Sequence, residues 1–489
     1  MMPTSALIEL CILIPACGAL FIAVSGRSPN LREGITLSTA LGLLCVVAAL
    51  YLRPDALHLA PIILGEPLPG LQFKLALEPL GMLFAGIASL LWVITSLYTI
   101  GYMRGNSESH QTRLYVCFAI ALASTMGIAL AGNLITMFLF YELLTMSTYP
   151  LVAHKQDHDA IAGGRFYLGI LISTSVGLLL PAIIWVWQLS GTTNFTPGGI
   201  LGSQLEPATV TMLLLMFAYG IGKAALMPIH RWLPEAMVAP TPVSALLHAV
   251  AVVKAGVFCM VKVVLYIFGV ELLSASGSNV ILTSIAGFTI VTASIIALRQ
   301  DNLKRRLAYS TISQLSYITL AVSLLTPQAI TGAAFHIASH AFGKITLFFA
   351  AGAIYTAAHK TRVSELNGIG RRMPVTMCAF AVASLSMIGL PPAGGFLSKW
   401  YIFQGAMVND NLAVVALFLC STLLNTSYLL PIVYVAFFKK ESHPPHNAHG
   451  EAPLTMVIAL TATAMLSLIL FFWPQIPLHL ASMLPGVGQ

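Results

Sequence analysis

The segment Gly222–Pro234, GKAALMPIHRWLP, puts one lysine and two prolines at the end of an apolar run that begins near residue 208. A charged side chain in hydrocarbon costs at least about 2.5–3.5 kcal/mol on insertion scales. Proline also removes a backbone hydrogen-bond donor, and irregular backbone at membrane depth is tolerated only inside protein or beside water. The segment therefore predicts a broken helix in the interior of a membrane protein.

A second segment has the same character. The sequence GLPPAGGF at Gly389–Phe396 interrupts another apolar run and is followed by Lys399. Interrupted segments in corresponding positions of two halves are typical of transporters with inverted repeats. The lysine precedes the break at Pro228 in the first segment and follows the break in the second. Two independent proline kinks therefore remain an alternative interpretation.

The composition indicates an all-α polytopic membrane protein. The chain has 489 residues, of which 57% are hydrophobic and 8% are charged, whereas a soluble domain needs roughly 25% charged residues. Apolar runs of about 20 residues, long enough to cross a bilayer, number about fourteen and leave no room for a soluble domain. They fall near residues 5–25, 35–52, 79–103, 114–131, 133–153, 166–188, 208–228, 242–268, 279–298, 306–325, 329–357, 375–404, 412–438 and 453–473.

The basic residues predict the orientation of these spans. With the N-terminus outside, the odd-numbered loops face the cytoplasm and hold seventeen basic residues, whereas the even-numbered loops hold only Arg53 and Lys74. This is a strong positive-inside bias, and it predicts fourteen spans with both termini outside. The seventeen are Arg27, Arg32, Arg104, Arg113, Lys155, Arg165, Arg231, Arg299, Lys304, Arg305, Arg306, Lys360, Arg362, Arg371, Arg372, Lys439 and Lys440.

Two inverted five-helix repeats are expected, because the interrupted spans seven and twelve are five spans apart and run in opposite directions. We expect three N-terminal helices in residues 1–110, a first repeat of spans four to eight in residues 111–270, a second repeat of spans nine to thirteen in residues 271–440, and a last helix in residues 441–489. The seven cysteines lie in apolar runs without a CxxC motif, and the chain has no P-loop. We therefore expect no cofactor, no metal site and no nucleic-acid partner.

Ionisable residues inside the predicted spans usually mark a path for protons or cations. Glu142 lies about ten residues from either end of its span, and burial without a partner would favour the neutral forms of both Glu142 and Lys223. Side by side they would both stay charged, and separating them would place a proton on Glu142. The alternative is a static buried ion pair that holds two helices together.

The eighth span contains Ser244, His248, Lys254 and Lys262. His248 and Lys254 are six residues apart, or roughly 120° around an ideal helix, so they face one narrow channel only if the helix is distorted. Lys254 is central in its span. Lys262 lies near the predicted outer end, where snorkelling of the side chain to the interface is the favoured interpretation.

The eleventh span carries His336, His340 and Lys344 at intervals of four residues, on one stripe of a helix. Two histidines at this spacing are able to bind a metal, but the segment has no carboxylate or cysteine to complete a site. A proton relay is favoured over a metal site and over histidines that neighbouring carbonyls satisfy. Lys399, with only the loop residue Asp410 nearby in sequence, is the expected terminal proton exchanger.

Three stretches resemble a known family. They are KAALMPIHRWLPEAMVAPTPVSALLHAVAVVKAG at Lys223–Gly256, DNLKRRLAYSTISQLSYI at Asp301–Ile318 and FHIASHAFGKITLFF at Phe335–Phe349. They are similar to the antiporter-like subunits of respiratory complex I and of Mrp-type cation/proton antiporters, and the resemblance covers roughly residues 70–440. It implies a fourteen-helix core, an input pair at Glu142 and Lys223, a central lysine at Lys254 with a histidine at His248, a connecting relay at His336, His340 and Lys344, and an exit at Lys399.

The resemblance also implies a partner complex. The pattern around the histidines is closest to the largest subunits of the family, but their long C-terminal extensions are missing after span fourteen, which favours a D-subunit-like protein. We expect a proton-translocating subunit of an Mrp-type Na⁺/H⁺ antiporter that works with other membrane subunits. The alternatives are the pumping subunit of an NADH:quinone oxidoreductase or membrane-bound hydrogenase, a subunit that drives a CO2- or bicarbonate-handling complex, and an intramembrane enzyme that uses the serines near His248 or His340.

Overall fold

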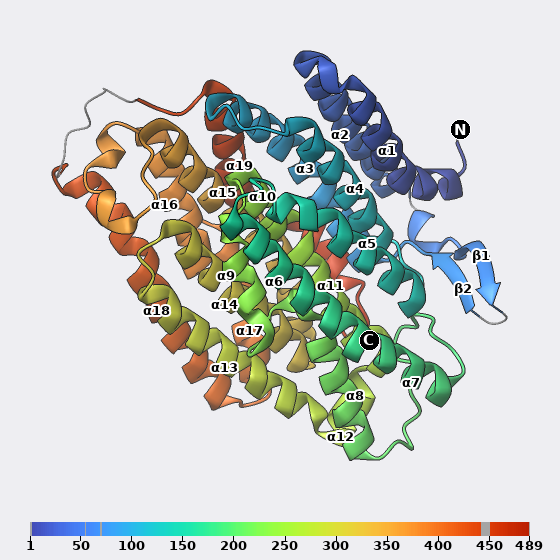
Figure 1. The fold of residues 1–489 in the computed structure, drawn as a ribbon. Helices are drawn as coiled ribbons and strands as arrows, with labels where there is room; N and C mark the ends of the chain where they lie inside the picture. Colours follow the sequence, from blue (N-terminus) through green and yellow to red (C-terminus); the bar gives the residue numbers. More distant parts are fainter. Residues whose placement is uncertain (1, 54, 69–70, 442–449, 489) are drawn as a thin grey trace.

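The computed structural model describes residues 2–53, 55–68, 71–441 and 450–488. Helices dominate these residues, with one antiparallel hairpin formed by β1 (Ile62–Leu68) and β2 (Leu71–Leu75). The uninterrupted long helices are α1 (Thr4–Val24), α2 (Pro29–Tyr51), α3 (Pro79–Gly105), α4 (Gln111–Ala129), α5 (Leu134–Val152), α13 (Ser278–Leu298), α14 (Leu303–Ser323), α15 (Pro327–Ala358), α18 (Leu412–Phe438) and α19 (Leu454–Phe472). Figure 1 shows α1 and α2 along one side of the bundle.

Other helices are interrupted or short. A π-helical turn joins α6 (His158–Thr174) to α7 (Leu180–Ser190), and a second joins α10 (Thr241–Ala245) to α11 (Val252–Val263). The remaining helices are α8 (Pro207–Gly220), α9 (Trp232–Glu235), α12 (Val270–Ser276), α16 (Pro374–Ile388), α17 (Gly394–Val408) and α20 (Gln475–Ser482).

The described chain contains eleven helices long and apolar enough to cross a membrane, which confirms an all-α multi-pass membrane protein. The predicted spans outside these eleven are the seventh, tenth and twelfth. α8 ends after 14 residues, and residues 389–393 separate α16 from α17. α14 is 21 residues long but contains Arg305, Arg306 and a run of hydroxyl side chains. The count of fourteen spans and the division into two repeats stay predictions.

Both interrupted segments are broken as expected, but the first break begins earlier than its proline predicts. α8 ends at Gly220, and Lys223 follows in a 3-10 turn, Gly222–Ala224. Ala225 has a φ of 56°, and regular helix resumes only at Trp232. Lys223 therefore lies inside the break rather than before it. Lys399 lies in the first two turns of α17, just after the second break.

The irregular segment at Lys223 packs against α11 at a glycine. An added Cβ at Gly256 would lie 2.3 Å from the carbonyl carbon of Lys223, which is backbone that cannot yield. Helix α11 therefore approaches the broken segment more closely than any larger residue allows. This contact fixes the position of Lys223 relative to Lys254, which lies two residues before Gly256 in α11.

We expect Gly256→Val to destabilise the protein by about 1–3 kcal/mol or more, because overpacking moves the backbone at Lys223. The measurement is the thermal midpoint of the purified protein in detergent. Gly86→Ala is the matched control, because Gly86 lies inside α3 with nothing within 4 Å of the added Cβ. An equal loss in both variants would contradict this account of the packing.

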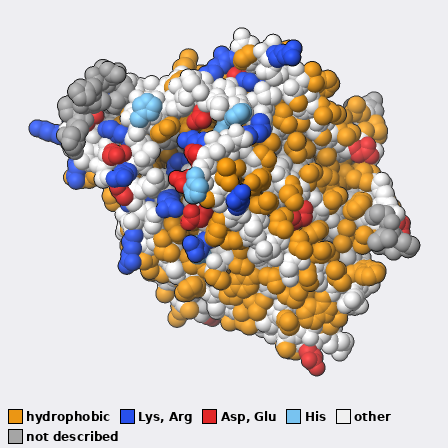
Figure 2. All heavy atoms as spheres, in the orientation of Figure 1, with side chains coloured by type: hydrophobic (Ala, Val, Ile, Leu, Met, Phe, Trp, Pro, Cys, Tyr) orange, Lys and Arg blue, Asp and Glu red, His pale blue; other side chains and the backbone are white. Residues whose placement is uncertain are grey.

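Basic residues gather at one end of the bundle, here named the basic face and defined by Arg104, Lys155, Lys304, Arg305 and Lys360. Lys155, Lys304 and Lys360 line one cavity there, and Arg305 pairs with Glu235 at 3.4 Å. Figure 2 shows the Lys and Arg side chains concentrated in the upper part of the view, above a broad hydrophobic surface. This division is the one expected for a protein with its apolar belt in lipid and its basic loops in water.

Candidate functional site

Lys223 is fully buried and is held by α5. Its Nζ donates hydrogen bonds to the Tyr141 carbonyl oxygen at 2.8 Å and to the Thr145 hydroxyl at 2.6 Å. The ammonium also lies 3.1 Å from the centroid of the Tyr141 ring, and the Tyr141 hydroxyl accepts a bond from the backbone N–H of Lys223. A carbonyl, a hydroxyl and an aromatic face thus replace the water that a buried ammonium loses.

Glu142 is half-buried beside this cluster, and the described structure shows no ion pair between it and Lys223. Its Oε1 is buried without a hydrogen-bond partner among the described residues. Tyr141 and Thr145, which bind Lys223, flank Glu142 on the same helix. The structure therefore shows Lys223 bound next to Glu142 rather than to it, and the exchange of Lys223 between the two positions stays a prediction.

The predicted stripe on α15 is present, and each of its members meets a different neighbour. The Nδ1 of His340 lies 2.6 Å from the Nζ of Lys254 on α11. Lys344 donates a bond of 2.8 Å to Ser310 on α14. The rings of His336 and His340 are stacked with centroids 6.0 Å apart. All five of these side chains are buried, so α15 brings polar groups from three helices into one row.

His248 and Lys254 both face α15, although their spacing on an ideal helix would separate them. The π-helical turn Leu246–Val250 supplies the distortion that the spacing requires. The His248 ring packs 4.7 Å from Phe348, and both of its ring nitrogens are buried without a partner in the described chain. Buried polar groups of this kind are usually satisfied by water. Ser244 donates to the Pro240 carbonyl instead of to His248.

Lys399 closes the row at the break between α16 and α17. Its Nζ donates to the carbonyl oxygens of Met387 at 2.8 Å and Ile388 at 3.1 Å, which the end of α16 leaves free. The ring of Tyr317 lies 4.7 Å from this amine and 5.9 Å from the His336 ring. Lys399 also borders a cavity of about 180 Å³ between α17 and α18. The break therefore supplies both the acceptors for Lys399 and its access to space outside the row.

The snorkelling predicted for Lys262 is wrong. Its side chain is 1% exposed and forms an ion pair with Glu78 at 2.5 Å. Lys262 reaches across to the start of α3, where the aromatic rings of Phe195 and Tyr266, 4.2 and 4.8 Å from its amine, shield it from the interface. A carboxylate within reach holds the amine more strongly than a distant interface does, and Glu78 was too far away in sequence to be recognised.

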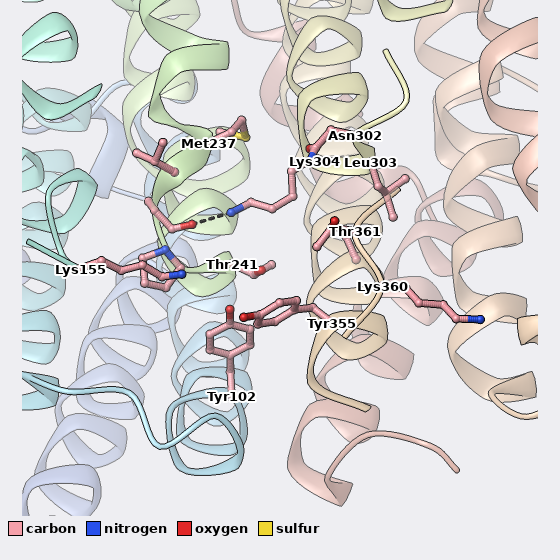
Figure 3. Close-up of a pocket in the computed structure, with 14 residues that line it drawn as sticks. Tyr102, Lys155, Met237, Thr241, Asn302, Leu303, Lys304, Tyr355, Lys360 and Thr361 are labelled. Carbon is pink, nitrogen blue, oxygen red and sulfur yellow. Dashed lines mark hydrogen bonds between the residues drawn. The ribbon is translucent and has the colours of Figure 1, made fainter. Parts of the chain in front are cut away.

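A cavity of about 170 Å³ opens at the basic face, where the ends of α3, α10, α14 and α15 meet. Figure 3 shows the hydroxyls of Tyr102 and Tyr355 close together on one side, with the amine of Lys304 bonded to a carbonyl and Lys360 extending away. The acceptor of Lys304 is the Ala239 carbonyl, at 2.5 Å. Tyr355 and Ala351 both belong to α15, so the helix that lines this cavity also carries the row of buried residues.

Helix α11 lies between the Lys223 cluster and the α15 row. No described hydrogen bond joins Lys223 to the row directly, whereas Gly256 of α11 abuts Lys223 and Lys254 of α11 bonds His340. Helix α11 therefore touches both clusters, at Gly256 and at Lys254. This arrangement allows the two clusters to influence each other without a shared hydrogen bond.

Several residues that contact the Lys223 cluster or the α15 row were not recognised from the sequence. They are Tyr141, Thr145, Ser310, Tyr317 and Ser398. Hydroxyl side chains commonly bond the carbonyl one turn back in membrane helices, so their presence alone carries no signal. The one sequence feature that pointed to some of these residues was the unusual polarity of α14, on which Ser310, Gln314 and Tyr317 are buried.

Ser398 gives a testable case. Its hydroxyl lies 2.8 Å from the Nδ1 of His336 and fixes the ring that separates His340 from Lys399. We expect Ser398→Ala to lower the rate of proton movement about tenfold, since a misoriented donor loses part of the gain from positioned proton transfer. The measurement is the initial rate in vesicles at equal protein levels. Ser427→Ala is the control, because Ser427 is exposed on α18 and, within the described chain, bonds only its own helix; equal losses would refute a role for the contact.

Comparisons with known proteins identify the family of this chain. The family described as "NADH:quinone oxidoreductase/Mrp antiporter, TM" matches residues 131–425. NADH-quinone oxidoreductase subunit N of Desulforudis audaxviator (strain MP104C) is 31% identical over 469 residues, which cover 92% of this chain and 90% of that protein. A probable K(+)/H(+) antiporter component of Rhizobium meliloti (strain 1021) is 33% identical over 410 residues, which cover 82% of this chain and 40% of that protein.

Two solved structures share the fold. A chain of the membrane-bound sulfane sulfur reductase, an archaeal respiratory membrane complex, aligns with a TM-score of 0.84 at 24% identity, over 97% of this chain and 96% of that chain. A chain of the Mrp complex from Dietzia sp. DQ12-45-1b aligns with the same TM-score and identity, over 99% of this chain and 52% of that chain. The whole described bundle is therefore a known architecture.

Proposed function

Because this chain belongs to the NADH:quinone oxidoreductase/Mrp antiporter transmembrane family, we propose that its buried row carries protons within a multi-subunit Mrp-type antiporter for monovalent cations. Family membership makes it an antiporter-like membrane subunit. The exchanged cation, with Na⁺ as the first to test, and the parent complex are parts of the proposal. We further propose an inner-membrane location with the basic face in the cytoplasm and both termini outside.

The proposed path begins at the cavity on the basic face. From there α15 presents Phe348, Lys344, His340 and His336 at intervals of four residues, toward the break at Lys399. The distance along α15 from Ala351 to His336 is about 22 Å at 1.5 Å per residue. A proton would pass His248, then the Lys254–His340 pair and His336, and leave through Lys399.

The observation that carries the proposal is the bond of 2.6 Å between Lys254 and His340. One of its two nitrogens donates and the other accepts, so the pair holds a single shared proton between two helices. A structural role would not require two basic groups to face each other at this distance inside an apolar bundle, because their repulsion when charged is costly. A group that transfers protons does require it.

The Lys223 cluster is proposed as the control element of this path. Movement of Lys223 from Thr145 to Glu142 would form an ion pair, and return would leave Glu142 to take up a proton. Helix α11 would transmit the change to Lys254 through its contact at Gly256. Each unit charge that crosses 100 mV carries about 2.3 kcal/mol, and compensated pairs allow this transfer without an isolated buried charge.

A second candidate function is the pumping subunit of a redox complex such as a quinone oxidoreductase or hydrogenase. It is supported by the 31% identity to NADH-quinone oxidoreductase subunit N of Desulforudis audaxviator, which extends over 92% of this chain. In both candidates the partners are other membrane subunits, and proton movement uses the same residues.

The deciding experiment is proton movement in inverted vesicles from cells that express the whole operon. A sodium-dependent signal without any electron donor would support the antiporter. A signal that appears only with NADH, formate or another donor would move the chain to a redox pump and overturn the antiporter proposal. Vesicles from cells lacking this one gene are the control for endogenous antiporters.

A further inference from the structure

Two buried polar stripes face each other between α14 and α18, and the path described above does not use them. The six side chains involved, three from each helix, are here named the α14–α18 seam. They are Ser310, Gln314 and Tyr317 on α14, and Ser421, Asn425 and Tyr428 on α18. In both helices the spacing is four residues and then three, which places each set on one face of its helix. Each stripe is about two turns long.

Contacts between the two helices pair the stripes in antiparallel order. At one end, the Tyr428 hydroxyl is hydrogen-bonded to Ser310 at 3.0 Å and also to the amide oxygen of Asn425. At the other end, the Tyr317 hydroxyl faces Ser421 and Asn425. Side chains of α14 and α18 therefore meet along the length of the seam, and Asn425 touches both ends of it.

The middle of the seam is short of hydrogen-bond partners. Five side-chain atoms there are buried without a bond to any residue that the structure describes: both polar atoms of the Gln314 amide, the Tyr317 and Ser421 hydroxyls, and the Asn425 amide nitrogen. Unbonded buried polar groups are costly, and water usually satisfies them. A buried water bonds about three polar groups, and the seam offers this number within one turn of each helix.

The seam ends at two lysines of the buried row. The Lys344 amine donates a bond of 2.8 Å to Ser310, and the Lys399 amine lies 4.7 Å from the centroid of the Tyr317 ring. The His336 ring, which the proposed path uses to reach Lys399, lies 5.9 Å from the same Tyr317 ring. The seam and His336 therefore lie side by side and lead to the same lysine.

We propose that the α14–α18 seam holds water and forms a second branch of the proton path, which connects Lys344 to Lys399 without passing His336. The inference rests on the proposed function, in which Lys399 is the exit. Both branches are fed by the Lys254–His340 pair. From His340 the proton goes either to His336 or to Lys344, each one turn away along α15.

Protons are conserved at each step of this branch. Lys344 gives up one proton to the seam, each hydroxyl or water there accepts one proton and passes one on, and the neutral amine of Lys399 takes up the last. Gln314 and Asn425 are positioning residues, because an amide has donors and an acceptor that orient water but does not itself exchange the transported proton.

The transport test compares Asn425→Leu in two backgrounds, by initial rates in inverted vesicles at equal amounts of assembled complex. Alone, Asn425→Leu is expected to stay within about twofold of wild type, because His336 still transfers protons. His336→Gln is expected to leave about a tenth of the rate, and adding Asn425→Leu should lower this remainder about tenfold or more, because both branches are then interrupted.

Thr426→Val is the matched control, because Thr426 adjoins Asn425 and, among the described residues, bonds only its own helix; it should change neither background. Equal factors for Asn425→Leu in both backgrounds, or no further loss when it is added to His336→Gln, would overturn the second branch. Wild-type rates in Lys399→Met would instead overturn the proposed function on which the branch rests.

A thermal measurement on the purified complex tests the water in the seam independently of transport. If water fills the seam, Gln314→Leu should lower the thermal midpoint, because leucine displaces water and leaves Ser421 and Asn425 without partners. If the seam is dry, the same change removes an unbonded buried amide, and the midpoint should rise. A midpoint at or above the wild-type value would overturn the proposal even if Asn425→Leu failed to assemble.

Discussion

Lys223→Met is expected to reduce proton movement by about 100-fold or more, the scale on which a positioned proton-transfer group contributes. Methionine fills a similar volume, but it removes the amine that bonds the Tyr141 carbonyl and the Thr145 hydroxyl. The Glu142 carboxyl would then lose its only candidate cationic partner in the described cluster. The measurement is the initial rate of proton movement in inverted vesicles, with the amount of assembled complex determined in the same preparation.

Two further variants separate the function of Lys223 from its packing. Thr145→Val removes one of the two acceptors and should cause a smaller loss, because the Tyr141 carbonyl remains. Lys74→Met is the matched lysine control, since Lys74 bonds Asn194 beside the hairpin and lies outside both clusters. Wild-type rates in Lys223→Met at normal assembly would refute the mechanism.

Interrupting the Lys254–His340 pair is expected to have a comparable effect. Lys254→Met and His340→Gln should each lower the rate by about 100-fold, because each removes one side of the 2.6 Å bond that is proposed to carry the proton between α11 and α15. The double variant should be no slower than either single variant, since the two residues serve one step.

A double-mutant comparison of this kind also distinguishes a relay from two independent defects. If the losses multiplied in the double variant, Lys254 and His340 would act in separate steps and the shared-proton interpretation would be wrong. Lys344→Met is a second variant for comparison with the pair, because Lys344 bonds Ser310 on a different helix and is not part of the Lys254–His340 bond. Thermal midpoints of the variants should stay near the wild-type value if only transfer is affected.

Local sequence was sufficient for much of the fold. Long apolar runs require helices in a bilayer because every backbone polar group must be bonded internally. Glycine and proline mark the breaks because they weaken or remove helix bonds. The interval of four residues places His336, His340 and Lys344 on one stripe whatever their neighbours are, and the structure confirms that stripe.

The partners of these residues were decided only by tertiary packing. Whether Lys223 bonds Glu142 or Thr145 depends on how the broken segment lies against α5, which no periodicity encodes. Lys262 does not snorkel, because it is buried against Glu78 at the start of α3. Glu78 lies 184 residues earlier in the chain. Sequence by itself determined which charges enter the membrane, since burial cost is a property of each residue and its span. The structure decided what each charge meets there, since that depends on contacts between helices far apart in the chain.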